Sequence, residues 1–200
     1  MKTIVVCFGL VMCVLSAATL AAGDSPTLRA VKTDTQPVID GSLDDPSWTH
    51  AAIAKDFINV YSTEKANHQT EAYVLYDDKN LYIAYKVYEP ELDNLKTEAS
   101  ERDGPVYGDD NVELFLDPAN KDRAVASKKY FHIIVNSKGV VDDRGGGYVK
   151  GGKKSWSPNY PLQTGRGKGH WIVEMALPMK DLFQGPQMGN VWRLNFNRTR

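Results

Sequence analysis

Residues 102–118 of the chain read Arg-Asp-Gly-Pro-Val-Tyr-Gly-Asp-Asp-Asn-Val-Glu-Leu-Phe-Leu-Asp-Pro. The first half contains glycine and proline and is typical of a loop. From residue 111 the side chains alternate between apolar and other types, which predicts a β-strand with one buried face. Val112, Leu114 and Leu116 then share one face, and Glu113, Phe115 and Asp117 share the other.

Further short strands surround this one in the sequence. Residues 71–76 and 81–88 alternate on either side of an Asp-Asp-Lys-Asn turn and predict a β-hairpin. Additional strands are expected at 130–136, 171–178 and 191–196, and short helical turns at 42–48 and 179–183. Residues 37–41 are expected to be the end of a strand followed by an Asp-Gly turn. With no long helical period, the pattern predicts an all-β, antiparallel β-sandwich of the immunoglobulin or jelly-roll kind.

Alternation also assigns faces and loops. On the second hairpin strand, Leu81, Ile83, Tyr85 and Val87 are expected to face the core, while Tyr82, Ala84, Lys86 and Tyr88 form a wetter face. The glycine-rich segment 144–152 is interpreted as a surface excursion, because no helix follows it to hold a phosphate.

The N-terminal region is typical of an export signal. A lysine at position 2 precedes an apolar run from residue 4 to 20, and small residues follow. We expect a signal peptide at 1–22, with a short membrane anchor as the alternative, a polar lead-in at 23–36 and the sandwich at 37–200. The protein is therefore expected to be secreted or periplasmic. Both cysteines, Cys7 and Cys13, lie in this signal, which leaves no disulfide framework.

Charge excludes some partners. The formal net charge is −1, with acidic and basic residues interspersed. Nothing in this distribution favours a nucleic acid or an anionic membrane as partner.

The carboxylates near residue 110 allow several interpretations. Asp110 and Glu113 have a spacing that would suit paired glycosidase carboxylates, but acidic residues before a strand are more often turn formers.

Asp-Asp pairs at 44/45, 77/78, 109/110 and 142/143 offer oxygen ligands for calcium, although most are explained by turns. A structural calcium is therefore an expectation without named ligands, and no cofactor is required.

A sugar site is the third interpretation. Sugars are held by aromatic faces together with carboxylates, amides and arginines. Tyr107, Asp110, Glu113 and Arg102 form such a set. The alternative is that Tyr107 packs over its loop and Arg102 pairs with Asp103 or Asp110.

The order of the segments adds a resemblance. The relevant segments are 38–41, 43–48, 76–84, 102–103, Tyr107, 110–117, 135–139, 171–178 and 192–198. This ordered set closely resembles the family 9 carbohydrate-binding modules, a group of DOMON-related β-sandwiches. The resemblance runs from about residue 37 to the last residue.

The resemblance implies a non-catalytic sugar-binding domain that is exported and often tethered to a glycosidase, with structural calcium in some members. It implies that Tyr107 replaces the tryptophan of a first aromatic wall and that Glu113 accepts sugar hydroxyls. Our hypothesis adds that Asp110 also accepts hydrogen bonds from the sugar hydroxyls and that Arg102 shapes the loop. The basic sugar-binding residue of the family has no clear counterpart, because its place near Ile134 is apolar. The second wall and a closing strand are expected beyond Arg200.

Two other functions remain open. A haem-binding relative would need axial ligands in one pocket, such as Met175 with His132 or His170. A structural or docking module within a longer exported chain is the other alternative.

Overall fold

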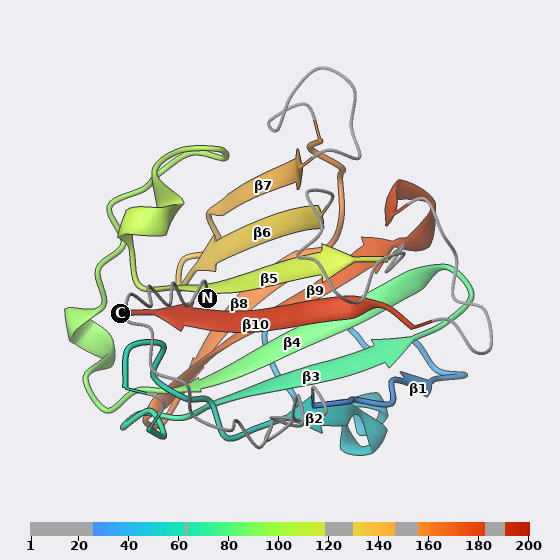
Figure 1. Ribbon diagram of the computed structural model, residues 1–200, viewed down its shortest axis with the longest axis horizontal. Coiled ribbons are helices and arrows are strands. Elements are labelled where there is room, and N and C mark those ends of the chain that lie inside the picture. The colour runs from blue at the N-terminus through green and yellow to red at the C-terminus, as the bar shows by residue number, and fades with distance from the viewer. Residues whose placement is uncertain (1–25, 63, 119–129, 147–155, 183–190) are drawn as a thin grey trace, which may run out of the picture.

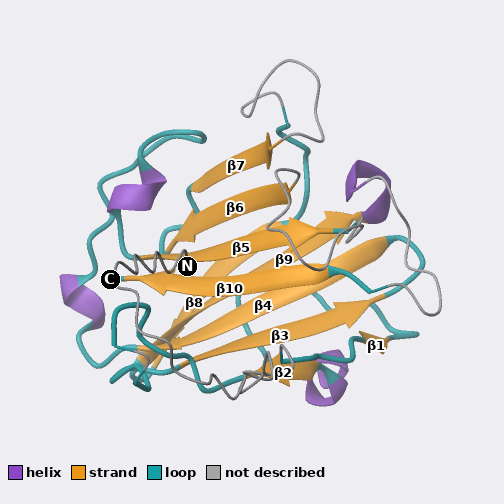
Figure 2. Ribbon diagram, viewed as in Figure 1, coloured by secondary structure: helices purple, strands orange, loops and turns teal. Residues whose placement is uncertain are grey.

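The computed structural model describes residues 26–62, 64–118, 130–146, 156–182 and 191–200. Two β-sheets pack face to face, as Figures 1 and 2 show. The larger sheet contains β1 (Val31–Lys32), β2 (Ala52–Ala54), β3 (Thr70–Tyr76), β4 (Asn80–Tyr88), β8 (Leu162–Gly167) and β9 (His170–Pro178). The smaller sheet contains β5 (Asn111–Asp117), β6 (Tyr130–Asn136), β7 (Val141–Gly146) and β10 (Arg193–Thr199). The predicted sandwich is confirmed.

The strand orders are β1-β3-β4-β9-β8, with β2 also paired to β3, and β10-β5-β6-β7. All these pairs are antiparallel except β1 with β3. The helical content described is four 3₁₀ turns, η1 (Pro46–His50), η2 (Leu92–Asn94), η3 (Val106–Gly108) and η5 (Met179–Leu182). None of the described helices is long and apolar enough to cross a membrane. The predicted signal peptide at 1–22 lies outside the described residues.

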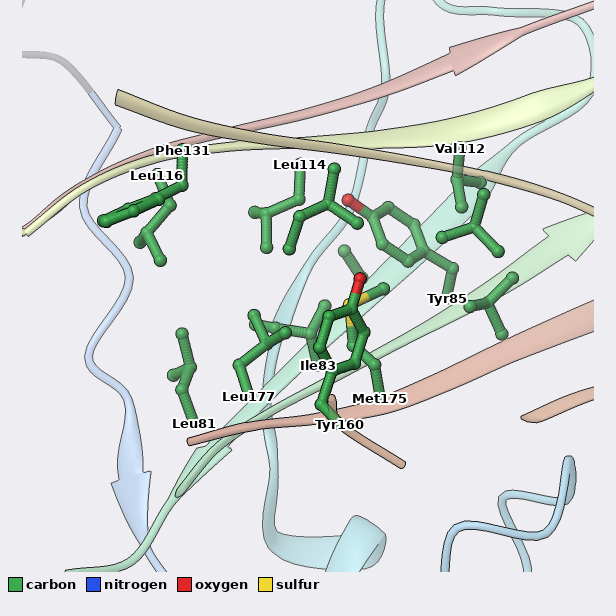
Figure 3. Packing of buried hydrophobic residues seen from close by; sticks show 14 of the residues in the cluster. Leu81, Ile83, Tyr85, Val112, Leu114, Leu116, Phe131, Tyr160, Met175 and Leu177 are labelled. Carbon is green, nitrogen blue, oxygen red and sulfur yellow. The ribbon is translucent and has the colours of Figure 1, made fainter. Parts of the chain in front are cut away.

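The core lies between the two sheets and follows the predicted alternation. Figure 3 shows how side chains from both sheets meet there. The smaller sheet contributes Val112, Leu114, Leu116 and Phe131, and the larger contributes Leu81, Ile83, Tyr85, Met175 and Leu177. Tyr85 is fully buried, and its hydroxyl donates to the backbone carbonyl of Glu113 at 2.8 Å. The expected core faces of the strands at 81–88 and 111–117 are therefore correct.

The outer face of the larger sheet corrects one expectation. Tyr82 and Ala84 were expected on a wetter face, but both are buried beneath Trp48, in a second apolar cluster with Leu75 and Ala176. The segment that leads into η1 and η1 itself cover this half of the sheet. Asp45 caps η1 by accepting from the backbone N–H of Ser47, which confirms the predicted helical turn.

The N-terminal strand was predicted in the wrong place. Residues 37–39 form no strand, although the chain turns at Asp40-Gly41 as expected, with a φ of +91° at Gly41. Instead, β1 lies within the segment expected to be a lead-in and pairs in parallel with β3. Sequence alternation also missed β2, which is short, and β8, which is polar and glycine-rich. A Cβ atom at Gly165 of β8 would lie 2.0 Å from the carbonyl oxygen of Gly41, so the two backbones need glycine to approach this closely.

The glycine-rich segment 144–152 is only partly a loop. Arg144 to Gly146 continue β7 and pair with β6, while 147–152 lie outside the described residues. Glycine fits at position 146 because its partner across the strands is Tyr130, whose ring occupies the space above it.

Candidate functional site

The outer face of the smaller sheet, which points away from the core, collects polar and aromatic side chains. Strand register places two rows across this face. The first row contains Asn197, Glu113, Ile134 and Asp142, and the second contains Asn195, Phe115, His132 and Arg144. Alternation with the buried Val112, Leu114, Phe131 and Ile133 fixes both rows on the outer side.

Glu113 is held in place from two sides. One carboxylate oxygen lies 2.7 Å from Nε2 of His132, and the other accepts from the hydroxyl of Thr199 at 3.3 Å. The His132 ring also stacks on Phe115, with ring centroids 3.8 Å apart and planes 14° apart. The half-buried Glu113 side chain is therefore fixed on a rigid strand, with its carboxylate on the outer face.

Tyr107 lies in η3, the turn that precedes β5 and packs against β6 and β7. Its neighbour Val106 is fully buried and packs with Ala99 and Ile134. Tyr107 itself is 64% exposed. Val106 thus anchors the turn and leaves the tyrosine ring free to contact a ligand.

Asp109 and Asp110 support this loop from below. The Asp109 carboxylate accepts from Asn136 Nδ2 at 2.9 Å and from the backbone N–H groups of Glu98 and Ala99 at 2.8 and 3.1 Å. Asp110 is buried, and its carboxylate accepts from the backbone N–H of Lys96 at 2.7 Å. Of the two carboxylates predicted to take sugar hydroxyls, Glu113 lies on the outer face and Asp110 braces the loop.

Arg102 has a different partner from the two considered above. Its guanidinium forms an ion pair with Asp143 on β7, with Nε at 3.2 Å from the carboxylate, and donates to the carbonyl of Pro158 at 3.0 Å. Burial raises the pKa of Asp143, and the Arg102 charge opposes this shift. Arg102 therefore ties the start of the loop to β7, as expected for a residue that shapes the loop.

Arg144 is a basic residue of this face that sequence reasoning missed. It pairs with the buried Asp142, and this hydrogen bond is the main reason that its pKa is raised. Ile134 is buried, in line with its predicted apolar character. His132 and Arg144 were not recognised as site residues, because only the pairing of β5, β6 and β7 places His132 against Glu113 and Arg144 across from His132.

The described residues do not support a haem pocket built from the proposed ligands. Met175 lies in the core, His132 lies on the outer face of the smaller sheet, and His170 lies on the outer face of the larger sheet. Within the described ranges, no group of three or more His, Cys, Asp or Glu residues is placed to hold a metal ion. A structural calcium therefore stays a prediction from the resemblance alone.

Comparisons with known proteins agree with this architecture. No curated protein matches the chain. A family 9 carbohydrate-binding module from Caldicellulosiruptor kristjanssonii, solved in complex with cellotriose, is 22% identical over 84% of this chain and 75% of its own, with a TM-score of 0.60. The same module solved with glucose is also 22% identical, over 85% and 77%, with a TM-score of 0.61.

The crystal structure of a protein from Bacteroides uniformis ATCC 8492, described as a "putative carbohydrate-binding protein", is 18% identical over 84% of this chain and 81% of its own, with a TM-score of 0.60. These likenesses show that the fold is shared. The model of the carbohydrate family 9 binding domain-like family matches residues 39–198, which is most of the chain. The chain therefore belongs to the carbohydrate family 9 binding domain-like family.

Proposed function

We propose that this chain is a non-catalytic carbohydrate-binding domain that holds a sugar on the outer face of its smaller sheet. Tyr107 covers the apolar C–H face of the sugar, and Glu113 accepts hydrogen bonds from its hydroxyls. The observation that carries the proposal is the fixed carboxylate of Glu113, held by His132 and Thr199 on the face beside an exposed aromatic loop.

The similar structures suggest the ligand class. The two Caldicellulosiruptor structures contain cellotriose and glucose, so glucose and its β-linked oligomers are the first ligands to test. The predicted signal peptide at 1–22 supports an exported domain. We further propose that it serves a carbohydrate-degrading protein by holding that protein on its substrate.

Replacing Glu113 by alanine should weaken sugar binding about 10- to 150-fold, because a hydrogen bond to a charged group contributes about 1.5 to 3 kcal/mol. Isothermal titration calorimetry with glucose, cellobiose and cellotriose measures the effect. Glu64→Ala, in an exposed loop, is the matched control and should bind like the wild type. Equal affinities of the two variants would refute the role of Glu113, and a wild type that binds none of these sugars would refute the proposed ligand class.

Replacing Tyr107 by alanine should reduce affinity about 2- to 12-fold, because an aromatic contact is worth about 0.5 to 1.5 kcal/mol. Tyr61→Ala is the control, since Tyr61 is 96% exposed on a loop outside the site. Intrinsic fluorescence titration with cellotriose can follow both variants. If Tyr107→Ala binds cellotriose as tightly as the wild type while Glu113→Ala loses binding, the sugar does not contact this loop.

A further inference from the structure

The outer face of the smaller sheet continues past Glu113 toward a group of aromatic rings. Phe115 is two residues along the same strand, a step of about 6.8 Å on one face. His132 stacks on Phe115, and the Tyr130 ring also contacts Phe115, with ring centroids 5.7 Å apart and planes 57° apart. All three rings are half-buried. They form a continuous aromatic cluster that adjoins the Glu113 carboxylate.

Tyr130 lies across the neighbouring strand. A Cβ atom at Gly146, its cross-strand partner, would be 3.3 Å from both Cε2 and Cζ of the Tyr130 ring. That distance is tighter than ordinary van der Waals contact, so a larger residue at this position would push the ring aside. The glycine thus leaves room for the Tyr130 ring to lie close to the backbone of β7.

Polar groups flank this cluster in the way that a sugar requires. Arg144 lies directly across from His132, and Asn195 lies across from Phe115 on the opposite side. Arginine donates and asparagine both donates and accepts hydrogen bonds, while the rings offer apolar surface. The row therefore places aromatic rings beside hydrogen-bonding side chains, one step further along the sheet from Glu113.

We infer that Phe115, His132 and Tyr130 form a second sugar subsite, so that the domain selects oligosaccharides over single sugars. The inference rests on the proposed function, because it places the second sugar unit next to the one held at Glu113 and Tyr107. The step between the rows is comparable to the length of one hexose unit in a chain. An oligosaccharide that lies along β5 contacts both rows, whereas a monosaccharide contacts only the first.

The test compares glucose and cellotriose by isothermal titration calorimetry on the wild type, Tyr130→Ala and Tyr130→Phe. Tyr130→Ala should weaken cellotriose binding about 2- to 12-fold and leave glucose affinity unchanged. Tyr130→Phe keeps the ring face and should retain the preference for cellotriose. Tyr130→Leu is a second variant, which keeps an apolar side chain but has no flat ring. It should also lose cellotriose affinity and keep glucose affinity, and it replaces Tyr130→Ala in the test if the alanine variant does not fold.

Each outcome is decisive. Equal losses for glucose and cellotriose would show a structural role for Tyr130 and overturn the subsite, as would unchanged affinity for both. Failure of the wild type to bind either sugar would overturn the proposed function and the subsite together. Loss of glucose binding in Glu113→Ala with no effect of Tyr130 on cellotriose would keep the proposed function and remove only the subsite.

Discussion

Replacing Glu174 by alanine is expected to lower the free energy of unfolding by about 3 to 5 kcal/mol. Glu174 is fully buried on β9, and its carboxylate accepts three hydrogen bonds. The donors are the indole N–H of Trp48 at 2.7 Å and the backbone N–H groups of Gly41 and Asp40 at 2.6 and 3.1 Å. Alanine would leave these donors without a partner and release the segment that covers the outer face of the larger sheet.

Urea denaturation at neutral pH measures this loss. Glu98→Ala is the matched control, because the Glu98 side chain is 77% exposed, and it should change stability by no more than about 0.5 kcal/mol. Glu174→Gln keeps one acceptor oxygen and should cost clearly less than alanine. If the alanine variants at 174 and 98 unfold at the same urea concentration, the Glu174 contacts do not hold this segment.

The Glu174 carboxyl also makes the stability of the protein depend on pH. Burial raises the pKa of Glu174 above its ordinary value of 4.5, and its three hydrogen bonds oppose this shift. The folded protein then binds the proton more tightly than the unfolded chain, so this group makes stability fall as pH rises from 4.5 through the raised pKa. Glu174→Gln should lack this part of the pH dependence when unfolding is followed across that range.

The main strands could be predicted because each carries its own pattern. In residues 111–117 every second side chain is apolar, and burial of one face is enough to specify the strand. The strand β8 has no such pattern, since its central residues are polar or glycine. It is held by pairing with β9 and by the close approach of Gly165 to Gly41, and neither contact is visible in the local sequence.

Long-range contacts also explain what sequence reasoning missed at the site. Glu113 and Tyr107 lie close together in the chain and were found from their order and the resemblance. The register of three strands is what brings His132 to Glu113 and places Arg144 across from His132. In the sequence, Glu174 resembles any polar residue on the outward face of a strand. Its hydrogen-bond partner Trp48 is 126 residues away, so the contact cannot be inferred from the local sequence.

Asp109→Ala is expected to lower the free energy of unfolding by about 2 to 4 kcal/mol and to weaken sugar binding as well. The Asp109 carboxylate holds two backbone N–H groups of the loop and the side chain of Asn136, which is fully buried. Without it these donors lose their acceptor, at about 1 to 3 kcal/mol for each buried group left unsatisfied. The loop that presents Tyr107 would lose its support, so calorimetric titration should show weaker binding to the folded variant.

Acidification should reduce the difference in free energy of unfolding between the wild type and Asp109→Asn. Burial opposes ionisation of Asp109, but the hydrogen bonds from Asn136, Glu98 and Ala99 outweigh it and lower its pKa below the ordinary 3.8. A lowered pKa contributes stability that is fully present above about pH 4 and is lost as pH falls through the folded-state value. Urea denaturation of both proteins at neutral and acidic pH should therefore give a stability gap that narrows on acidification. If the difference in free energy of unfolding stays constant with pH, changed packing destabilises the asparagine variant rather than loss of the carboxylate. In that case Val106 and its apolar neighbours hold the loop in position.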